Sequence, residues 1–371
     1  MANGSLLIER IESIALRVPL GQAYLGSHYK MTHRSPIVIR IHTSAGIVGQ
    51  CYTGDEDSTL ESILEIIENE ISPKLIGQDA RHVERCWSLT RKTTFDILRD
   101  RRLALVATAA VDAAIWDAYG QLLKEPLWRL WGGFRNSLPV IEIGGYYGMK
   151  MPLDKEIEQA RNRGVAGMKL KIGGQSPAVD AARIKLARRT AGPDFVIMVD
   201  ANQAWKPKEA IEFVRLAEDL DITWFEEPCE WNNDVADLRN VRFSSAVRIC
   251  AGQSEHSAAG CRRLMEGDAI DYCNFDASWS GGPTEWRRAA AIAQTFNVEM
   301  AHHEEPQVAS HLLASIPHGS YLETFNPDRD PIWPNLVANR PELTNGMMQL
   351  PDGPGFGWVL DEDYIKKYRV N

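Results

Sequence analysis

The strongest constraint on the fold is a regular alternation of short apolar segments with longer amphipathic ones between about residues 139 and 325. The apolar segments read PVIEIGGYY, GMKLKIGG, DFVIMVDAN, DITWFEEP, VRICAGQ, DYCNFDAS, VEMAHH and SYLETF. Strands that alternate with helices form parallel βα units. The pattern predicts an α/β fold with a (β/α)8-type barrel over 139–325, whose last helix is short or altered. An open, doubly wound sheet is the alternative.

The rest of the chain forms two further parts. Residues 1–130 read as strands, IESIALRVPL and SPIVIRIHTSAGIVG, followed by helices, of which LALVATAAVDAAIWDAYGQLL is the clearest. This order predicts a separate α+β N-terminal domain. Residues 326–371 are rich in proline and turn-forming residues. We expect this C-terminal segment to pack back on the N-terminal domain.

Composition narrows the classes of partner. The formal net charge of −9 argues against nucleic acid or an anionic membrane as the main partner. The six cysteines show no CxxC spacing, so we expect buried free thiols and a reducing, cytoplasmic setting. We find no signal-peptide pattern and expect no bilayer-spanning segment. No glycine-rich phosphate-binding motif opens a helix. We expect a homo-oligomer that acts on a small molecule.

Side chains capable of chemistry stand at the ends of successive predicted strands. They are Lys171, Asp200, Glu226, Gln253, Asp276, His303 and Glu323. Neighbouring members are about one βα unit apart, so each comes from the next strand. Because the carboxyl ends of barrel strands converge on one face, where active sites lie, we expect these side chains to share one site.

Two lysines on one strand suggest a base. Lys169 and Lys171 lie at positions i and i+2, so both point to the same face. Each ammonium disfavours protonation of the other, which predicts a lysine pKa lowered toward neutrality. Such a lysine can remove a proton at ordinary pH.

Two carboxylates on adjacent strands suggest a metal site. Asp200 and Glu226 are hard oxygen ligands of the kind that Mg²⁺ prefers. Either residue alone could be an ordinary strand-end carboxylate or helix cap. Together with Asn202 and the two lysines, they predict a site for Mg²⁺, one ion per subunit.

A second acid–base pair follows later strands. A carboxylate such as Asp276 that binds one imidazole nitrogen of His303 fixes the tautomer, raises the pKa and leaves the other nitrogen free for proton transfer. Glu323, if protonated, could donate to a developing oxyanion; it could equally be a solvated strand-end carboxylate. Trp279 follows Asp276 closely and is expected to line the pocket.

Taken together, these motifs resemble the enolase superfamily, in its mandelate racemase subgroup. The sequence KLK is similar to the KxK motif of that subgroup, VDANQAW to its DxN motif, and WFEEP to its second metal ligand. NFDASWSGG with MAHH resembles its Asp–His dyad, and LE at 322–323 its electrophilic Glu. The resemblance covers nearly the whole chain. It implies that the N-terminal domain caps the barrel and that the C-terminal segment completes this capping domain.

The resemblance also implies a chemistry, the removal of a proton next to a carboxylate that is chelated by Mg²⁺. Lys171 would be the base on one face, and His303, held by Asp276, the acid or base on the other. Lys169 and Glu323, with the metal, would stabilise the intermediate. One position departs from the pattern, because Gln253 replaces the usual third metal-ligand Glu. Either Gln253 ligates the metal, or Glu255 takes its place if the chain stays extended.

Three functions remain open on the sequence. The leading prediction is dehydration of an acid sugar to a 2-keto-3-deoxy product, and racemisation or epimerisation of a 2-hydroxy acid is the alternative. A non-catalytic protein is a further alternative because of Gln253. Residues 20–35 and 51–58 are expected to cover the site, and their polar side chains favour a polyhydroxylated substrate. The residues predicted to bind the substrate are Asn202, Tyr24, His28 and Trp279.

Overall fold

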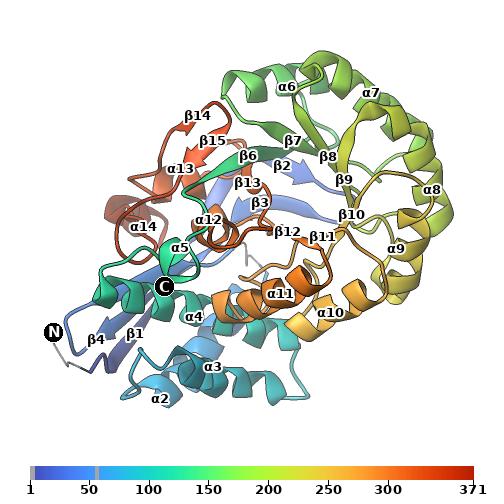
Figure 1. Cartoon of the computed structure of the whole chain (residues 1–371). Coiled ribbons are helices and arrows are strands. Elements are labelled where there is room, and N and C mark those ends of the chain that lie inside the picture. The colour runs from blue at the N-terminus through green and yellow to red at the C-terminus, as the bar shows by residue number, and fades with distance from the viewer. Residues whose placement is uncertain (1–4, 55–57) are drawn as a thin grey trace.

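A closed barrel of parallel strands forms the larger part of the molecule (Figure 1). The computed structural model describes residues 5–54 and 58–371. The barrel strands are β6 (Ser137–Gly144), β7 (Gly167–Lys171), β8 (Val196–Asp200), β9 (Ile222–Glu226), β10 (Ile249–Ala251), β11 (Tyr272–Cys273), β12 (Glu299–Met300) and β13 (Leu322–Phe325). Consecutive strands pair in parallel from β6 to β12, and β13 pairs with β6. A bridge between Met300 and Gly319 closes the ring. The predicted barrel is confirmed, and the open sheet is excluded.

One helix follows each barrel strand except the last. These helices are α6 (Leu153–Asn162), α7 (Pro177–Ala191), α8 (Pro207–Leu216), α9 (Asp234–Arg242), α10 (Ala258–Glu266), α11 (Pro283–Thr295) and α12 (Pro306–Ser315). After β13 there is only the short α13 (Ile332–Leu336), which agrees with the prediction that the last helix is short or altered. Short 3-10 helices, η3 (Glu218–Leu220) and η4 (Trp231–Asn233), precede β9 and α9.

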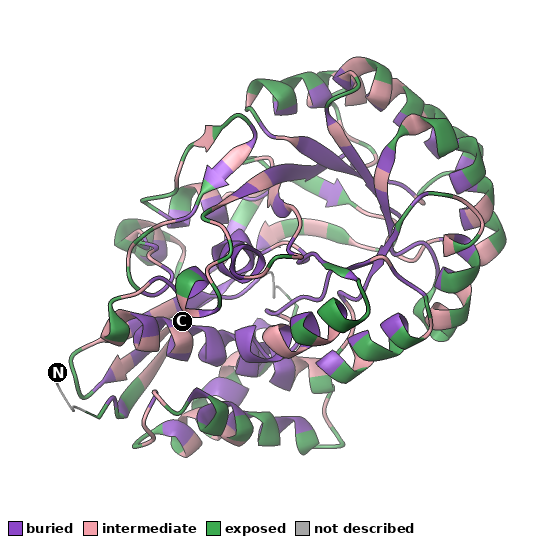
Figure 2. Ribbon diagram, in the orientation of Figure 1, coloured by how far each residue is buried: buried purple, intermediate pink, exposed green. Residues whose placement is uncertain are grey.

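Helix α8 shows why these segments become surface helices. Pro207 occupies the first turn, where its fixed φ suits a helix and its missing N–H costs no hydrogen bond. The side chain of Glu209 accepts a hydrogen bond from the backbone N–H of Lys206 at 3.1 Å. Buried residues Ala210, Phe213 and Val214 lie at positions i, i+3 and i+4 and cover the outside of the sheet. In Figure 2 the barrel strands are buried, whereas the outer helices are buried on one face and exposed on the other.

The barrel interior is filled in layers that place the site. Successive side chains of a strand point to opposite faces, so Met198 and Asp200 face inward on β8, as do Trp224 and Glu226 on β9. Met198 and Trp224 belong to an apolar cluster inside the barrel. The carboxylates lie one layer nearer the C-terminal ends of the strands. Apolar packing therefore supports the polar residues from below.

The N-terminal domain combines a small sheet, a hairpin and helices. Its strands are β1 (Ile8–Ala15), β4 (Ile37–Thr43) and β5 (Val48–Tyr52) in one antiparallel sheet, and β2 (Val18–Leu25) with β3 (Lys30–Arg34) in a hairpin. Its helices are α1 (Leu60–Glu65), the π-helix η1 (Ile66–Ile71), α2 (Ser72–Leu75), α3 (Val83–Arg91), the 3-10 helix η2 (Lys92–Phe95), α4 (Arg101–Leu123) and α5 (Leu127–Leu130). The hairpin β2–β3 contains most of the segment 20–35 that was expected to cover the site, and it reaches over the barrel (Figure 1).

The long helix α4 is apolar over most of its length. Among the described residues it is the one helix that is long and apolar enough to cross a membrane. However, 83% of its apolar window is buried inside the protein. It packs against β4, β5, α3 and α11. Its length and composition are therefore those of a core helix.

The C-terminal segment contacts both larger parts. It contains β14 (Leu343–Thr344), β15 (Met347–Gln349) and α14 (Glu362–Tyr368). β15 pairs antiparallel with β6 and so extends the barrel sheet. The chain end returns to the N-terminal domain, where the backbone N–H of Arg17 donates to the carbonyl of Tyr368 at 3.0 Å. β6 begins at Ser137, slightly before the predicted start of the barrel.

Candidate active site

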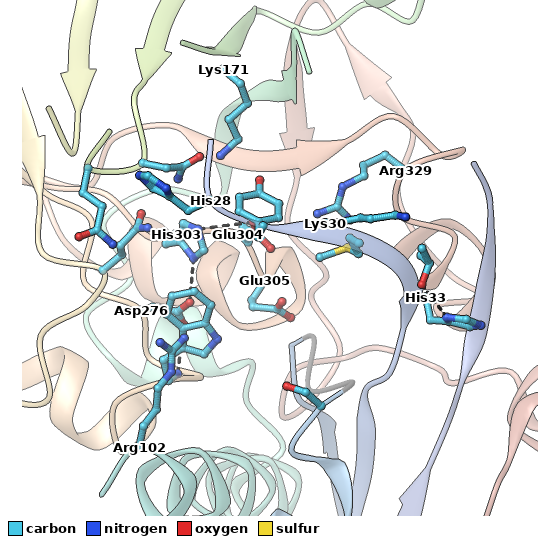
Figure 3. Close-up of a pocket in the computed structure, with 18 of the residues that line it drawn as sticks. His28, Lys30, His33, Arg102, Lys171, Asp276, His303, Glu304, Glu305 and Arg329 are labelled. Carbon is cyan, nitrogen blue, oxygen red and sulfur yellow. Dashed lines mark hydrogen bonds and ion pairs between the residues drawn. The ribbon is translucent and has the colours of Figure 1, made fainter. Parts of the chain in front are cut away.

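A cavity of about 410 Å³ lies at the C-terminal ends of the barrel strands. Its wall combines barrel residues with residues of the β2–β3 hairpin. The barrel side and the loops around it contribute Lys171, Asn202, Gln203, Trp231, Gln253, Asp276, Trp279, His303, Glu304, Glu305 and Arg329. The N-terminal domain contributes His28, Tyr29, Lys30, Met31, Thr32, His33, Ser58 and Arg102. Figure 3 shows Lys171 and His303 both directed at this space. The predicted convergence of strand ends on one site is therefore observed.

The two lysines each form ion pairs with buried carboxylates. Lys171 Nζ donates to Asp200 Oδ2 at 2.6 Å. Lys169 Nζ lies deeper and donates to Glu226 Oε1 at 2.7 Å and to Glu323 Oε1 at 2.5 Å. All five side chains are at most 3% exposed. Lys169 thus links β7 to both β9 and β13 across the barrel.

Because of these ion pairs, the pKa of each lysine differs from the prediction. Burial lowers the pKa of Lys171, but the carboxylate of Asp200 outweighs it and raises that pKa well above its ordinary value. Burial likewise opposes the charged form of Lys169, and Glu226 and Glu323 raise its pKa. The prediction of a lowered lysine pKa is wrong here, because it considered the second ammonium and omitted the nearer carboxylates.

The two predicted metal ligands lie side by side in register. Asp200 on β8 is paired with Glu226 on β9. Burial raises the pKa of Asp200, and the two lysines more than offset this and lower it. Burial raises the pKa of Glu226 to about 8; Lys169 acts against the shift, and the charge of Asp200 adds to it. Asp200 therefore carries negative charge beside Glu226, and a bound cation would favour the ionised form of both carboxylates.

Asn202 follows Asp200 in a strained turn. Its backbone N–H donates to Asp200 Oδ1 at 2.8 Å, and its Nδ2 donates to Asp200 Oδ2 at 3.0 Å. Asn202 and Gln203 have φ of +46° and +58°, a conformation that costs energy for residues other than glycine. Asn202 Oδ1 is buried and has no hydrogen-bond partner within residues 5–54 and 58–371. An acceptor of this kind is open to a ligand.

The structure separates the two candidates for the third metal ligand. Gln253 lines the cavity, and its Oε1 accepts from Asn274 Nδ2 at 3.1 Å. The chain turns at Gly252, whose φ is +129°, and does not stay extended. Glu255 consequently points elsewhere, where Oε1 accepts from Arg263 Nη2 at 2.8 Å beside a different cavity. The alternative that used Glu255 as a ligand is corrected by this placement.

Asp276 and His303 form the expected dyad. His303 Nδ1 lies 3.0 Å from Asp276 Oδ2, and Asp276 Oδ1 accepts from the hydroxyl of Ser278 at 2.6 Å. His303 Nε2 lies 3.4 Å from Glu304 Oε1. Burial lowers the pKa of His303, but Glu304 and Asp276 outweigh burial and raise it to about 9. His303 therefore carries a proton at neutral pH.

The neighbouring His302 has a different environment. The backbone N–H of Ala277 donates to its Nε2 at 3.1 Å, so its Nδ1 carries the proton and donates to the carbonyl of His303 at 2.9 Å. Burial lowers the pKa of His302. With both ring nitrogens engaged, His302 is a structural residue.

Glu323 lies within β13 rather than at its end. Oε1 accepts from Lys169, and Oε2 accepts from the backbone N–H of Glu304 at 2.9 Å. Both oxygens therefore act as acceptors in this arrangement. The expected donation from Glu323 to an oxyanion stays a prediction.

The predicted substrate residues divide into two groups. Asn202, His28 and Trp279 line the cavity. The ring of Trp279 lies 4.7 Å from that of His303, and the guanidinium of Arg102 lies 3.8 Å from the Trp279 ring. Tyr24 is buried behind the cavity and packs edge-on against Tyr146 at 5.4 Å. The assignment of Tyr24 to the cavity wall is therefore corrected.

Sequence reasoning missed several cavity residues. Glu304 and Glu305 follow His303 directly and have φ of +54° and +51°. Their signal in the sequence was the acidic pair next to the histidines. Arg102 and Arg329 had no such signal, because one lies on a capping-domain helix and the other in a turn after β13. Part of the predicted covering segment 51–58, namely residues 55–57, lies outside the described residues.

Comparison with known proteins agrees with this geometry. Residues 153–364 match the family model described as enolase C-terminal domain-like. Residues 15–132 match the model of the mandelate racemase / muconate lactonizing enzyme, N-terminal domain.

Individual relatives match over nearly the whole chain. A 3,6-anhydro-alpha-L-galactonate cycloisomerase of Streptomyces coelicolor is 29% identical, over 98% of this chain and 100% of that protein. An arabinonate dehydratase of Saccharolobus solfataricus is 28% identical over 90% of both chains. The crystal structure of a mandelate racemase/muconate lactonizing enzyme from a marine actinobacterium, in complex with magnesium, is 56% identical, with a TM-score of 0.95 over 99% of this chain and 100% of that one. The chain belongs to the enolase superfamily, in its mandelate racemase subgroup.

Proposed function

We propose that the protein is a Mg²⁺-dependent enzyme that removes the α-proton of a carboxylate substrate and dehydrates an acid sugar. One observation carries the proposal. Lys171 from β7 and His303 from the turn after β12 line the same cavity, above a layer of buried carboxylates. Two proton-transfer groups from distant strands can act on different sides of one bound substrate.

The donor set fits Mg²⁺. Asp200 and Glu226 supply carboxylate oxygens, and Gln253 supplies a neutral amide oxygen at the cavity wall. The partnerless Asn202 Oδ1 adds a further acceptor nearby. Asp200, Glu226 and Gln253 would hold the ion. When bound, Mg²⁺ supplies Lewis-acid stabilisation of the negative charge that develops on the substrate carboxylate.

The chain's own groups divide the proton chemistry. Lys171 Nζ faces the cavity and would be the base for the α-proton once Asp200 binds a cation, because that carboxylate is what raises the pKa of Lys171. Lys169 is fully buried and keeps its positive charge, so it stabilises negative charge on the substrate oxygens by electrostatic attraction. Glu323 holds Lys169 and the turn at Glu304 in place.

The protonation state of His303 suits dehydration. A pKa raised to about 9 leaves the imidazolium ready to give its proton to a departing β-hydroxyl, which leaves as water. The α C–H bond and the β C–O bond are then broken, and the resulting enol becomes the 2-keto-3-deoxy acid. The dehydratase and the cycloisomerase among the relatives both carry names of sugar-acid enzymes, which supports an acid sugar as the substrate.

Racemisation or epimerisation is the second candidate. The same observation supports it, because Lys171 and His303 come from strands on different sides of the barrel. In that reaction His303 would return a proton to carbon rather than to oxygen. The raised pKa of His303 does not separate the two, but the polar residues of the cavity wall favour a hydroxylated substrate.

The decisive experiment screens a library of sugar mono- and diacids with Mg²⁺. Semicarbazide detects 2-keto-3-deoxy products, and NMR in D₂O detects exchange of the α-proton. Keto product identifies a dehydratase, whereas exchange without keto product identifies a racemase or epimerase. Enzyme treated with EDTA and enzyme with Lys171→Met are the controls. If neither keto product nor α-proton exchange is detected and the protein does not bind Mg²⁺, the non-catalytic alternative would be favoured.

A further inference from the structure

Arg329 is a buried cation in the cavity wall for which the proposed proton chemistry has no use. It lies in the turn between β13 and α13 and is 1% exposed. Its Nε donates to the hydroxyl of Tyr146 at 3.3 Å. Its Nη1 is buried and has no hydrogen-bond partner among the described residues. A fully desolvated guanidinium with a free N–H group is unfavourable unless a ligand completes its bonding.

Three aromatic rings hold Arg329 in position. Its guanidinium carbon lies 4.5 Å from the ring centre of Phe325 and 5.6 Å from those of Tyr24 and Tyr146. Aromatic rings stabilise a cation only partly, because each contributes less than a paired carboxylate. The rings also restrict the rotation of the planar group. The guanidinium is therefore preorganised but not neutralised.

Three carboxylates in this part of the protein form ion pairs with another arginine. Arg34 lies 3.8 Å from Glu304, 3.6 Å from Glu305 and 3.7 Å from Asp330. Within the described part of the chain, Arg329 forms no ion pair of this kind, although the charge of Glu304 acts on it from a greater distance. Of the two arginines, Arg329 therefore has the positive charge that is more available to a ligand.

Further cations lie at the same end of the cavity. In Figure 3, Lys30 and His33 of the hairpin are on the Arg329 side, whereas Asp276 and Arg102 are on the other. Lys30 is exposed and His33 is partly buried, and both line the cavity. A single cavity therefore offers the Lys171 site to one carboxylate and a second cationic region to another group.

We propose that Arg329 binds the distal carboxylate of a dicarboxylic acid sugar, with Lys30 as an outer contact. The proposal rests on the proposed function, because the first carboxylate is the one placed at the metal site. A planar guanidinium matches a carboxylate in geometry and can donate two parallel hydrogen bonds to it. The cavity volume of about 410 Å³ lies within the range of small-molecule sites.

The test uses matched pairs of acids that share chain length and configuration and differ only at the far end. Each aldarate is compared with its aldonate, which carries a hydroxymethyl group there, and with the aldonate 6-phosphate. We expect kcat/KM for the best aldarate to exceed that for its aldonate by about 100-fold. Arg329→Gln should remove most of this ratio, and Arg329→Lys should retain part of it because the charge remains.

The control is Arg188→Gln, which removes a partly buried arginine outside the cavity that donates to the carbonyls of Phe195 and Asp221. It should leave the aldarate-to-aldonate ratio unchanged. A wild-type enzyme that turns over aldonates as fast as aldarates would overturn the Arg329 proposal and leave the proposed function standing. A higher kcat/KM for the aldonate 6-phosphates than for the aldarates would overturn the carboxylate assignment and show that Arg329 binds a phosphate group instead. Absence of α-proton exchange with every acid would overturn the proposed function itself, and the proposal with it.

Discussion

Lys171 Nζ lies 2.6 Å from Asp200 Oδ2, so the expected base and an expected metal ligand form one buried ion pair. The two roles are therefore in competition for the same carboxylate. Asp200 can bind a cation well only to the extent that it gives up the ammonium. This relationship makes metal affinity a readout of the state of Lys171.

Replacing Lys171 by an uncharged residue should therefore strengthen Mg²⁺ binding while it abolishes turnover. Lys171→Met removes the competing positive charge beside Asp200, and we expect the dissociation constant of Mg²⁺ to fall roughly tenfold, about 1.4 kcal/mol. Equilibrium dialysis measures the affinity, and the α-proton exchange assay measures the activity. Retained exchange would remove Lys171 from the chemistry, and weaker Mg²⁺ binding would place the ion elsewhere.

A second variant tests the neutral ligand. Gln253→Glu keeps the hydrogen bonds with Asn274, whose amide bonds the backbone N–H and the side-chain Oε1 of residue 253. It adds a negative charge at the cavity wall, so the Mg²⁺ affinity should rise by about tenfold or more. The matched control is Glu255→Gln, which breaks an ion pair with Arg263 beside a different cavity. Isothermal titration should show no change in Mg²⁺ affinity for that control. The reverse pattern would reinstate Glu255.

The alkaline limit of activity should report on His303. Burial opposes its charged form, but Glu304 and Asp276 raise its pKa to about 9, so an acid role requires activity to decline as the pH rises through about 9. Glu304→Gln removes one of the two stabilising charges and should move this limb of kcat/KM to lower pH by about one unit. The backbone N–H of Glu304 still bonds Glu323 in the variant, so the turn is preserved. An unmoved limb would assign it to another group.

The regular alternation of strand and helix segments in the sequence was enough to predict which side chains lie together in the site. Asp200 and Glu226 end adjacent strands, and the parallel barrel brings such ends together whatever the loops do. His303 was likewise matched to Asp276 because they follow neighbouring strands. These predictions rest on backbone geometry, which the alternation of strand and helix specifies.

The charge balance and the loop contacts could not be predicted in this way. The pKa of Lys171 depends on its distance from Asp200, which strand register alone does not give. Glu255 was a plausible ligand until the turn at Gly252 directed it away. Arg329 is distant in sequence from the hairpin whose Tyr24 ring packs on it. Side-chain rotamers and turns decide such contacts, and the hydrophobic pattern carries no information about either.

The last prediction concerns the indole beneath the site. Trp224 is fully buried, and its Nε1 donates to Glu226 Oε2 at 3.2 Å, so it both fills the barrel and holds a metal ligand. Trp224→Phe leaves that oxygen without its donor, and we expect a loss of about 1–3 kcal/mol in the free energy of unfolding together with weaker Mg²⁺ binding. Trp286→Phe is the matched control, because Trp286 is equally buried and its Nε1 has no partner in the described structure. Urea unfolding should show a smaller loss for the control, which removes an indole of the same size but no hydrogen bond. Equal losses would assign the effect to packing alone, and the hydrogen bond to Glu226 would then contribute nothing measurable.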